Sequence, residues 1–307
     1  MPNSLYNFVL SVNLCFVLPI YGVSAVTYEQ SESRFGDQLQ LYLHAKWLSY
    51  QHKISLLYKP FVHAEAFALS ETEEPWALSK ELSFLKFKRY EVGETIRESV
   101  LYDVPYFSEC TDDVFHPMLF TMDWNDQEFI SLLKKAFAPK QPPPRISFPL
   151  LDNLITVALH VRTGRGYDPG DPHMIWPLRF APISFYVESV RIVASKFIGK
   201  SLYVYVFTDD PDPLSIVSTL QQALADLPIE IDCRQEGNHH RSNIIEDFFS
   251  MMDFDCLIRS TSNYSLIPAM IGEYKMVISP KHHRWQVHGN VVENYIDEKL
   301  IRENLTE

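Results

Sequence analysis

The stretch LDNLITVALHVRTGRGYD, residues 151–168, decides the fold of this chain. Its apolar run over 154–159, rich in β-branched residues, predicts a buried strand that delivers His160 and Arg162 to its carboxyl end. A loop of glycine and arginine follows. Since an arginine fork grips phosphate oxygens in pairs and glycine lets backbone N–H groups approach an anion, the stretch predicts a site for a phosphorylated ligand. A salt bridge to a carboxylate is the alternative interpretation of the arginine.

The bulk properties are those of a globular protein, with 307 residues of which 46% are hydrophobic and 21% charged. A formal net charge of -12 at pH 7 argues against a general nucleic-acid or anionic membrane surface, although a local arginine cluster still suits a small anionic ligand. Cysteine and histidine spacings predict neither a disulfide framework nor a metal site. The residues considered are Cys15, Cys110, Cys233 and Cys256, together with His239, His240, His282 and His283.

The N-terminal segment is largely apolar over 8–26 and carries the small residues Val23, Ser24 and Ala25 near its end. This pattern predicts a secretory signal peptide over 1–25, although no Lys or Arg precedes the apolar run. A weak anchor or a buried segment is the alternative, because polar residues make the run a poor membrane span. A signal peptide would direct the protein to the secretory pathway or export it, and without one the protein would stay in the cytoplasm.

Hydrophobic periodicity divides the chain into alternating strands and helices. In the first half it predicts strands over 26–30 and 54–58, and helices over 39–52, 78–88 and 126–136. In the second half it predicts strands over 155–160, 202–208, 229–233, 256–260 and 276–279, and helices over 183–197, 214–227, 243–252 and 262–272. Strands that alternate with helices form parallel sheets covered on both faces.

The proline-rich run QPPPR, residues 141–145, cannot continue a helix and marks a domain boundary. We therefore predict an α/β protein with two Rossmann-like domains, over 26–140 and 146–290, whose parallel sheets face a central cleft. Residues 291–307 are predicted to form a helical tail.

Polar side chains gather in four loops at the ends of predicted strands, which is where α/β folds bind ligands. In chain order the loops carry Gly36, then His160 with Arg162, then Asp209, then Ser260, Ser262 and Asn263. Hydroxyls and N–H groups at a helix start suit a phosphate, and an Asp carboxylate can accept two hydrogen bonds from a purine edge. Turn formation and helix capping are the alternatives for each loop taken alone.

Taken in order, these loops resemble those of the fucosyltransferase superfamily, which includes the α1,2-, α1,6- and protein O-fucosyltransferases. The resemblance extends over about residues 26–290 and is thin between 60 and 145. The segments that carry it are SRFGDQLQLYLHAKWLSYQ (33–51), ALHVRTG (158–164), VFTDDPDP (206–213), IEDFFSMMDFDCLIRSTSNYSLIPAMIG (245–272) and VISPKHHRW (277–285).

The resemblance implies a GT-B-like arrangement of two Rossmann-like domains. It also implies transfer of fucose from GDP-fucose to a glycan or glycoprotein acceptor, with inversion and without a metal or any other cofactor. Arg162 would then hold the β-phosphate and stabilise the departing GDP, His160 would contact the ribose or phosphate, and Asp209 would read the guanine edge. The remaining residues would surround the phosphates and border the donor from the other domain: Ser260, Ser262, Asn263 and Gly36.

Two features depart from the pattern of the superfamily. Many members have a second arginine directly after the motif arginine, and Thr163 stands there in this chain. The usual acid is displaced to Asp168 or Asp171 in an enlarged loop, so the candidates for the catalytic base are Asp168, Asp171 and Asp37, in that order. These departures leave a second hypothesis open, in which the chain is a degenerate, non-catalytic module that binds a GDP-sugar.

Overall fold

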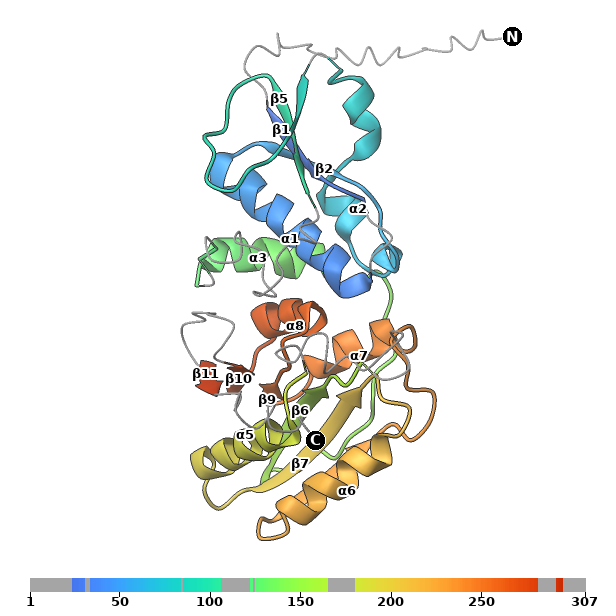
Figure 1. Ribbon diagram of the computed structural model, residues 1–307, viewed down its shortest axis with the longest axis vertical. Helices are drawn as coiled ribbons and strands as arrows, with labels where there is room; N and C mark the ends of the chain where they lie inside the picture. The colour runs from blue at the N-terminus through green and yellow to red at the C-terminus, as the bar shows by residue number, and fades with distance from the viewer. Residues whose placement is uncertain are drawn as a thin grey trace, which may run out of the picture.

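The structure is a computed structural model that describes residues 24–30, 34–83, 85–105, 122–123, 125–164, 180–280 and 291–294. Its described part contains two parallel β-sheets, each with its own helices, placed one above the other along the long axis of the molecule (Figure 1). The predicted α/β class and the pair of parallel sheets are therefore confirmed.

The first sheet lies in the N-terminal half and has the described strand order β3-β2-β1-β5-β4. Its strands are β1 (Ala25–Tyr28), β2 (Ser55–Tyr58), β3 (Glu74–Pro75), β4 (Lys86–Arg89) and β5 (Val100–Val104). The helical segments of this half are α1 (Phe35–His52), α2 (Leu69–Thr72), α3 (Gln127–Ala136) and the 3₁₀ helices η1 (Ala64–Ala66) and η2 (Trp76–Lys80). Strand β1 is central and buried along its whole length, so its apolar side chains form the middle of this layer.

The second sheet has the described strand order β11-β10-β9-β6-β7-β8. Its strands are β6 (Leu154–Val161), β7 (Ser201–Thr208), β8 (Ile229–Cys233), β9 (Cys256–Ile258), β10 (Met276–Pro280) and β11 (Val291–Asn294). The helical connections are α5 (Ile183–Lys196), α6 (Pro213–Ala223), α7 (Ile244–Met251), η5 (Asn263–Ser265) and α8 (Leu266–Ile271). Strand β6 pairs with both β7 and β9 and is therefore an interior strand, and it is buried from Ile155 to Val161.

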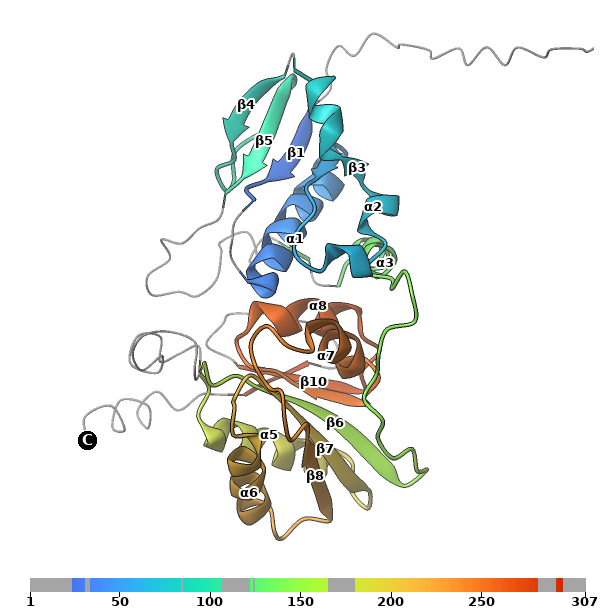
Figure 2. The same cartoon turned by 90° about the vertical axis from the view of Figure 1, so that its right-hand side faces the viewer.

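Helices α7 and α8 lie between the two sheets, whereas α5 and α6 cover the opposite face of the second sheet (Figures 1 and 2). The apolar side chains of α7 and α8 belong to the same buried cluster as those of the N-terminal half. The ring centroid of Phe248 in α7 lies 6.1 Å from that of Phe35 and 5.2 Å from that of Phe67. One aromatic core therefore packs α7 against the N-terminal half and joins the two halves.

Two expectations from the sequence are corrected by the structure. The helix predicted over 78–88 is instead the 3₁₀ helix η2 followed by strand β4, because Lys86, Phe87 and Lys88 alternate along an edge strand paired with β5. The helical tail predicted over 291–307 is wrong at its start, since β-branched Val291 begins strand β11, which pairs in parallel with β10. The second sheet thus extends past residue 290.

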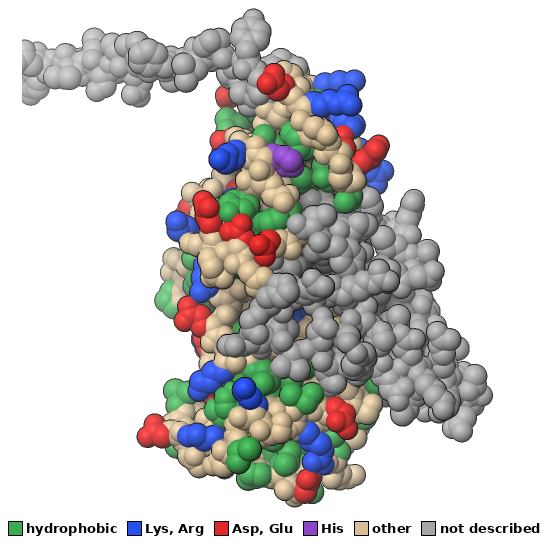
Figure 3. All heavy atoms as spheres, turned by 90° about the vertical axis from the view of Figure 1, so that its left-hand side faces the viewer, with side chains coloured by type: hydrophobic (Ala, Val, Ile, Leu, Met, Phe, Trp, Pro, Cys, Tyr) green, Lys and Arg blue, Asp and Glu red, His purple; other side chains and the backbone are tan. Residues whose placement is uncertain are grey.

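Ala25 is the last residue of the predicted signal segment, and it is also the first residue of β1, where it is fully buried. On the face seen in Figure 3, side chains of both charges are spread over both halves of the molecule. Within the described ranges, the apolar helices are too short or too polar to span a membrane.

Candidate functional site

A cleft of ≈ 710 Å³ that opens to solvent lies between the first turn of α1 and the carboxyl ends of β6 and β7. The region from β8 into α7 and the start of η5 complete its described walls. This position, at the carboxyl ends of parallel strands, is the one at which such sheets place ligands.

Arg162 supplies a positive charge to the cleft. It directly follows β6, and its Nη1 donates to Ser262 Oγ at 3.2 Å, so the guanidinium links the first strand-end loop to the start of η5. Its Cζ lies 5.7 Å from the ring centroid of Phe180. A guanidinium held in this way is oriented for oxyanions in the cleft.

His160 lies two residues earlier on the same face of β6 and is 8% exposed. Its Nδ1 is 3.4 Å from Ser260 Oγ, and its ring meets that of Tyr264 edge-on with centroids 5.6 Å apart. Burial lowers the pKa of His160 to about 3, with Arg162 and Arg259 adding to the effect. The imidazole is therefore neutral at physiological pH and can act as a hydrogen-bond partner, while the charge in the cleft comes from arginine.

Arg259 is a second arginine at this site, and it was not among the site residues predicted from the sequence. It follows β9 and is only 2% exposed. Nη1 donates to Ser279 Oγ at 3.0 Å and Nη2 to the Ser262 carbonyl at 2.9 Å. Burial lowers the pKa of Arg259 to about 9, so it remains charged at pH 7 and adds positive potential behind the cleft. The signal in the sequence was an arginine placed directly after the apolar run Cys-Leu-Ile.

Asn263 joins the C-terminal half to α1 at the cleft. Its Nδ2 donates to Asp37 Oδ1 at 3.1 Å and to Gln40 Oε1 at 2.7 Å. Gly36 is required at this junction, because a Cβ there would lie 2.9 Å from the backbone nitrogen of Tyr264. The first turn of α1 thus presents its positive dipole end at the cleft, next to the start of η5.

Asp209 follows β7 and holds the loop that follows β6. Its Oδ1 accepts from Thr163 N at 2.9 Å, from Thr163 Oγ1 at 3.5 Å and from Gly164 N at 3.5 Å. The carboxylate also lines the cleft. Its role in reading a guanine edge stays a prediction. The structure gives Asp209 a second role, because its carboxylate accepts hydrogen bonds from the backbone of the loop after β6.

Asp247 is a further carboxylate in the cleft wall, in the first turn of α7, and it was not among the site residues predicted from the sequence. Arg234 donates to its Oδ1 at 2.7 Å. Burial raises the pKa of Asp247 to about 6, although the arginine opposes this rise. The signal in the sequence was its position in the first turn of the helix that follows β8, and therefore at the ligand-binding edge of the sheet.

His239 and His240 also lie in the cleft wall, with ring centroids 4.0 Å apart. Burial, with His239 as a second cause, lowers the pKa of His240. In the described part of the chain, no group of three or more His, Cys, Asp and Glu side chains is arranged to hold a metal ion.

The structure brings most of the predicted site residues together. Those that line the cleft are Gly36, Asp37, His160, Arg162, Asp209, Ser262 and Asn263. Ser260 is fully buried next to His160 and is not among the residues that line the cleft. Asp168 and Asp171 lie outside the described residues.

No protein-family model matches the chain, and no curated protein matches it. Among solved structures, the chain is similar to a mutant of FUT1 from Arabidopsis thaliana in complex with GDP, with a TM-score of 0.48, 10% identity, and coverage of 85% of this chain and 72% of that chain. It is also similar to the alpha-1,6-fucosyltransferase NodZ soaked with GDP-fucose, with a TM-score of 0.42, 10% identity, and coverage of 89% and 100%. For fucosyltransferase NodZ from Bradyrhizobium the TM-score is 0.39 and the identity 12%, with coverage of 85% and 95%.

Proposed function

We propose that the chain is a glycosyltransferase that transfers fucose from GDP-fucose to a glycan or protein-linked acceptor, with inversion and without a metal. The observation that carries the proposal is the convergence of separate strand-end loops on one cleft, where they surround the guanidinium of Arg162. A diphosphate fits this arrangement, because it would meet a fixed cation, serine hydroxyls and a helix N-terminus together.

In this mechanism the acceptor hydroxyl attacks the anomeric carbon of fucose as its bond to the β-phosphate oxygen breaks. Negative charge then develops on the departing GDP, and Arg162 stabilises it in place of a metal. Neutral His160 donates to the ribose or phosphate, and Ser262 and Asn263 flank the phosphates. The acceptor proton passes to a carboxylate, for which Asp168, Asp171 and Asp37 remain the candidates in that order.

The base of the nucleotide needs a carboxylate that accepts from its adjacent N–H donors. Asp209 is the residue that the superfamily resemblance assigns to this task. Because Oδ1 of Asp209 already accepts from the backbone at Thr163, we propose that Asp247, which lines the same cleft, supplies a further acceptor.

A GDP titration by calorimetry tests the donor site. Native protein should bind GDP, and Arg162→Ala should weaken binding by about 1.5–3 kcal/mol, which is the usual value of a hydrogen bond to a charged group. Arg191→Ala is the matched control, because Arg191 in α5 pairs with Asp226 and neither residue lines the cleft. No GDP binding by folded native protein, or equal binding by Arg162→Ala, would overturn the proposal.

A second function, the non-catalytic GDP-sugar-binding module, is favoured by one observation. Thr163 stands where many members of the superfamily have an arginine, and its backbone and hydroxyl are bonded to Asp209 instead. Release of GDP from GDP-fucose with a panel of glycan acceptors separates the two functions. Turnover that Arg162→Ala abolishes would establish the enzyme, whereas GDP binding without turnover would establish the module.

A further inference from the structure

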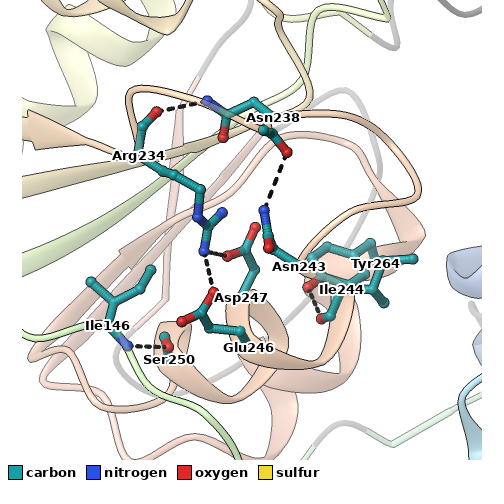
Figure 4. Close-up of polar contacts among 10 residues, drawn as sticks. Ile146, Arg234, Asn238, Asn243, Ile244, Glu246, Asp247, Ser250 and Tyr264 are labelled. Atoms are coloured by element: carbon teal, nitrogen blue, oxygen red, sulfur yellow. Dashed lines mark hydrogen bonds and ion pairs between the residues drawn. The ribbon is translucent and has the colours of Figure 1, made fainter.

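Arg234 connects the end of β8 to the first turn of α7. It follows Cys233, the last residue of β8, and its Nη2 lies 2.6 Å from Glu246 Oε2 and 2.7 Å from Asp247 Oδ1 (Figure 4). The three side chains are largely buried, with exposures of 19% for Arg234, 27% for Glu246 and 14% for Asp247. One guanidinium therefore balances two acids that are adjacent in sequence and shielded from water.

The backbone around Arg234 is fixed as well. Its carbonyl accepts from Asn238 Nδ2 at 2.6 Å, and Asn243 Nδ2 donates to the Gly237 carbonyl at 3.3 Å (Figure 4). These bonds close the loop over 234–243 on itself. Arg234 thus lies at the start of this loop, which also contains His239 and His240, and its side chain contacts the two acids in the first turn of α7.

Of the two acids that Arg234 contacts, Asp247 is the one that lines the cleft. We propose that Arg234 is a positioning residue that keeps the carboxylate of Asp247 ionised and turned toward the cleft, where it accepts hydrogen bonds from the nucleotide. This inference rests on the function proposed above, and it adds a residue that touches neither the nucleotide nor the sugar.

The electrostatic surroundings of Asp247 explain why an arginine is needed there. The groups that interact with Asp247 are Arg234 after β8, Glu246 in α7, Tyr205 in β7 and Tyr264 in η5, and of these Arg234 carries the positive charge. Arg34, Arg162 and the cleft histidines line the same cleft. Burial and Glu246 raise the pKa of Asp247, whereas Arg234 lowers it, with a balance at about 6. Removing the guanidinium would raise the pKa further, so that Asp247 would be protonated near neutral pH.

The test is the pH dependence of GDP affinity, measured by calorimetry from about pH 5.5 to about pH 8.5. We expect Arg234→Met to move the midpoint of the Asp247-linked change upward by about one pH unit or more. A shift of one unit weakens GDP binding roughly twofold at pH 7, approaches tenfold near pH 5.5 and has little effect at the alkaline end. Arg234→Lys should restore much of the native profile. Asp247→Asn supplies the baseline, because phosphate groups themselves titrate near pH 6.

Arg191→Met is the matched control, since it removes an arginine paired with Asp226 outside the cleft. Circular dichroism establishes that each variant is folded. If native protein binds GDP and the midpoint of Arg234→Met is unmoved, the inference is wrong, because a structural role alone would weaken binding equally at every pH. If native protein binds no GDP at any pH, the proposed function fails and this inference fails with it.

Discussion

His160 should make the free energy of unfolding of the protein decrease as the pH falls below 6.5, by an amount that follows from its pKa. Its side chain is 8% exposed, and burial lowers its pKa to about 3 from an unfolded value of 6.5. The unfolded chain therefore takes up a proton between these values while the folded protein does not, so stability is retained above pH 6.5 and lost as pH falls toward 3. At pH 5 the loss is about 1.5 pH units at 1.36 kcal/mol each, or about 2 kcal/mol.

Urea denaturation of native protein and His160→Gln at about pH 7.5 and about pH 5 measures this loss. Other groups also titrate in this range. Asp247 acts in the opposite direction, because its folded pKa of about 6 lies above the unfolded value and its contribution to stability falls as pH rises. We therefore compare, for each protein, the change in the free energy of unfolding between about pH 7.5 and about pH 5. This change should be about 2 kcal/mol smaller in His160→Gln than in native protein, because Asp247 contributes equally to both. Equal pH dependences in native protein and variant would refute the assignment of a neutral, desolvated His160.

Two further changes address the junction between the halves. Gly36→Ala should lower the free energy of unfolding by roughly 1–3 kcal/mol and also weaken GDP binding, because the new Cβ would lie 2.9 Å from Tyr264 N. Unfolding in urea and GDP calorimetry measure the two effects. Native values for both would contradict the close approach of the two segments. Asn263→Ala should cost about 1–3 kcal/mol in the same unfolding assay, because it leaves Asp37 and Gln40 without their shared donor; a cost near zero would show that these bonds do not join the halves.

Local patterns were sufficient for much of the fold. The alternation of apolar strands with amphipathic helices predicted two parallel sheets. The spacing of apolar residues within each segment indicates whether it is a strand or a helix, and strands that alternate with helices pair in parallel. The same patterns failed for β4, where charged residues at a sheet edge leave little apolar signal, and for Val291, whose strand is defined only by pairing with β10.

The site shows a similar division. The chain by itself determined that His160, Arg162 and Asn263 stand at strand ends, since in a parallel fold the end of a strand is also the edge at which ligands bind. Only the tertiary structure decided which side chains these residues meet. Arg234 and Asp247 are separated by a loop and a helix turn, and nothing in their spacing reveals that they pair.

The shared aromatic core that packs α7 against the N-terminal half was equally hidden, because contacts between distant segments depend on how the chain folds back and not on local periodicity. Composition and periodicity therefore determined the layers of this protein and the edge that carries its cleft. The charge balance and the hydrogen-bond partners at the cleft were decided by the tertiary structure, because burial and pairing are properties of neighbours in space.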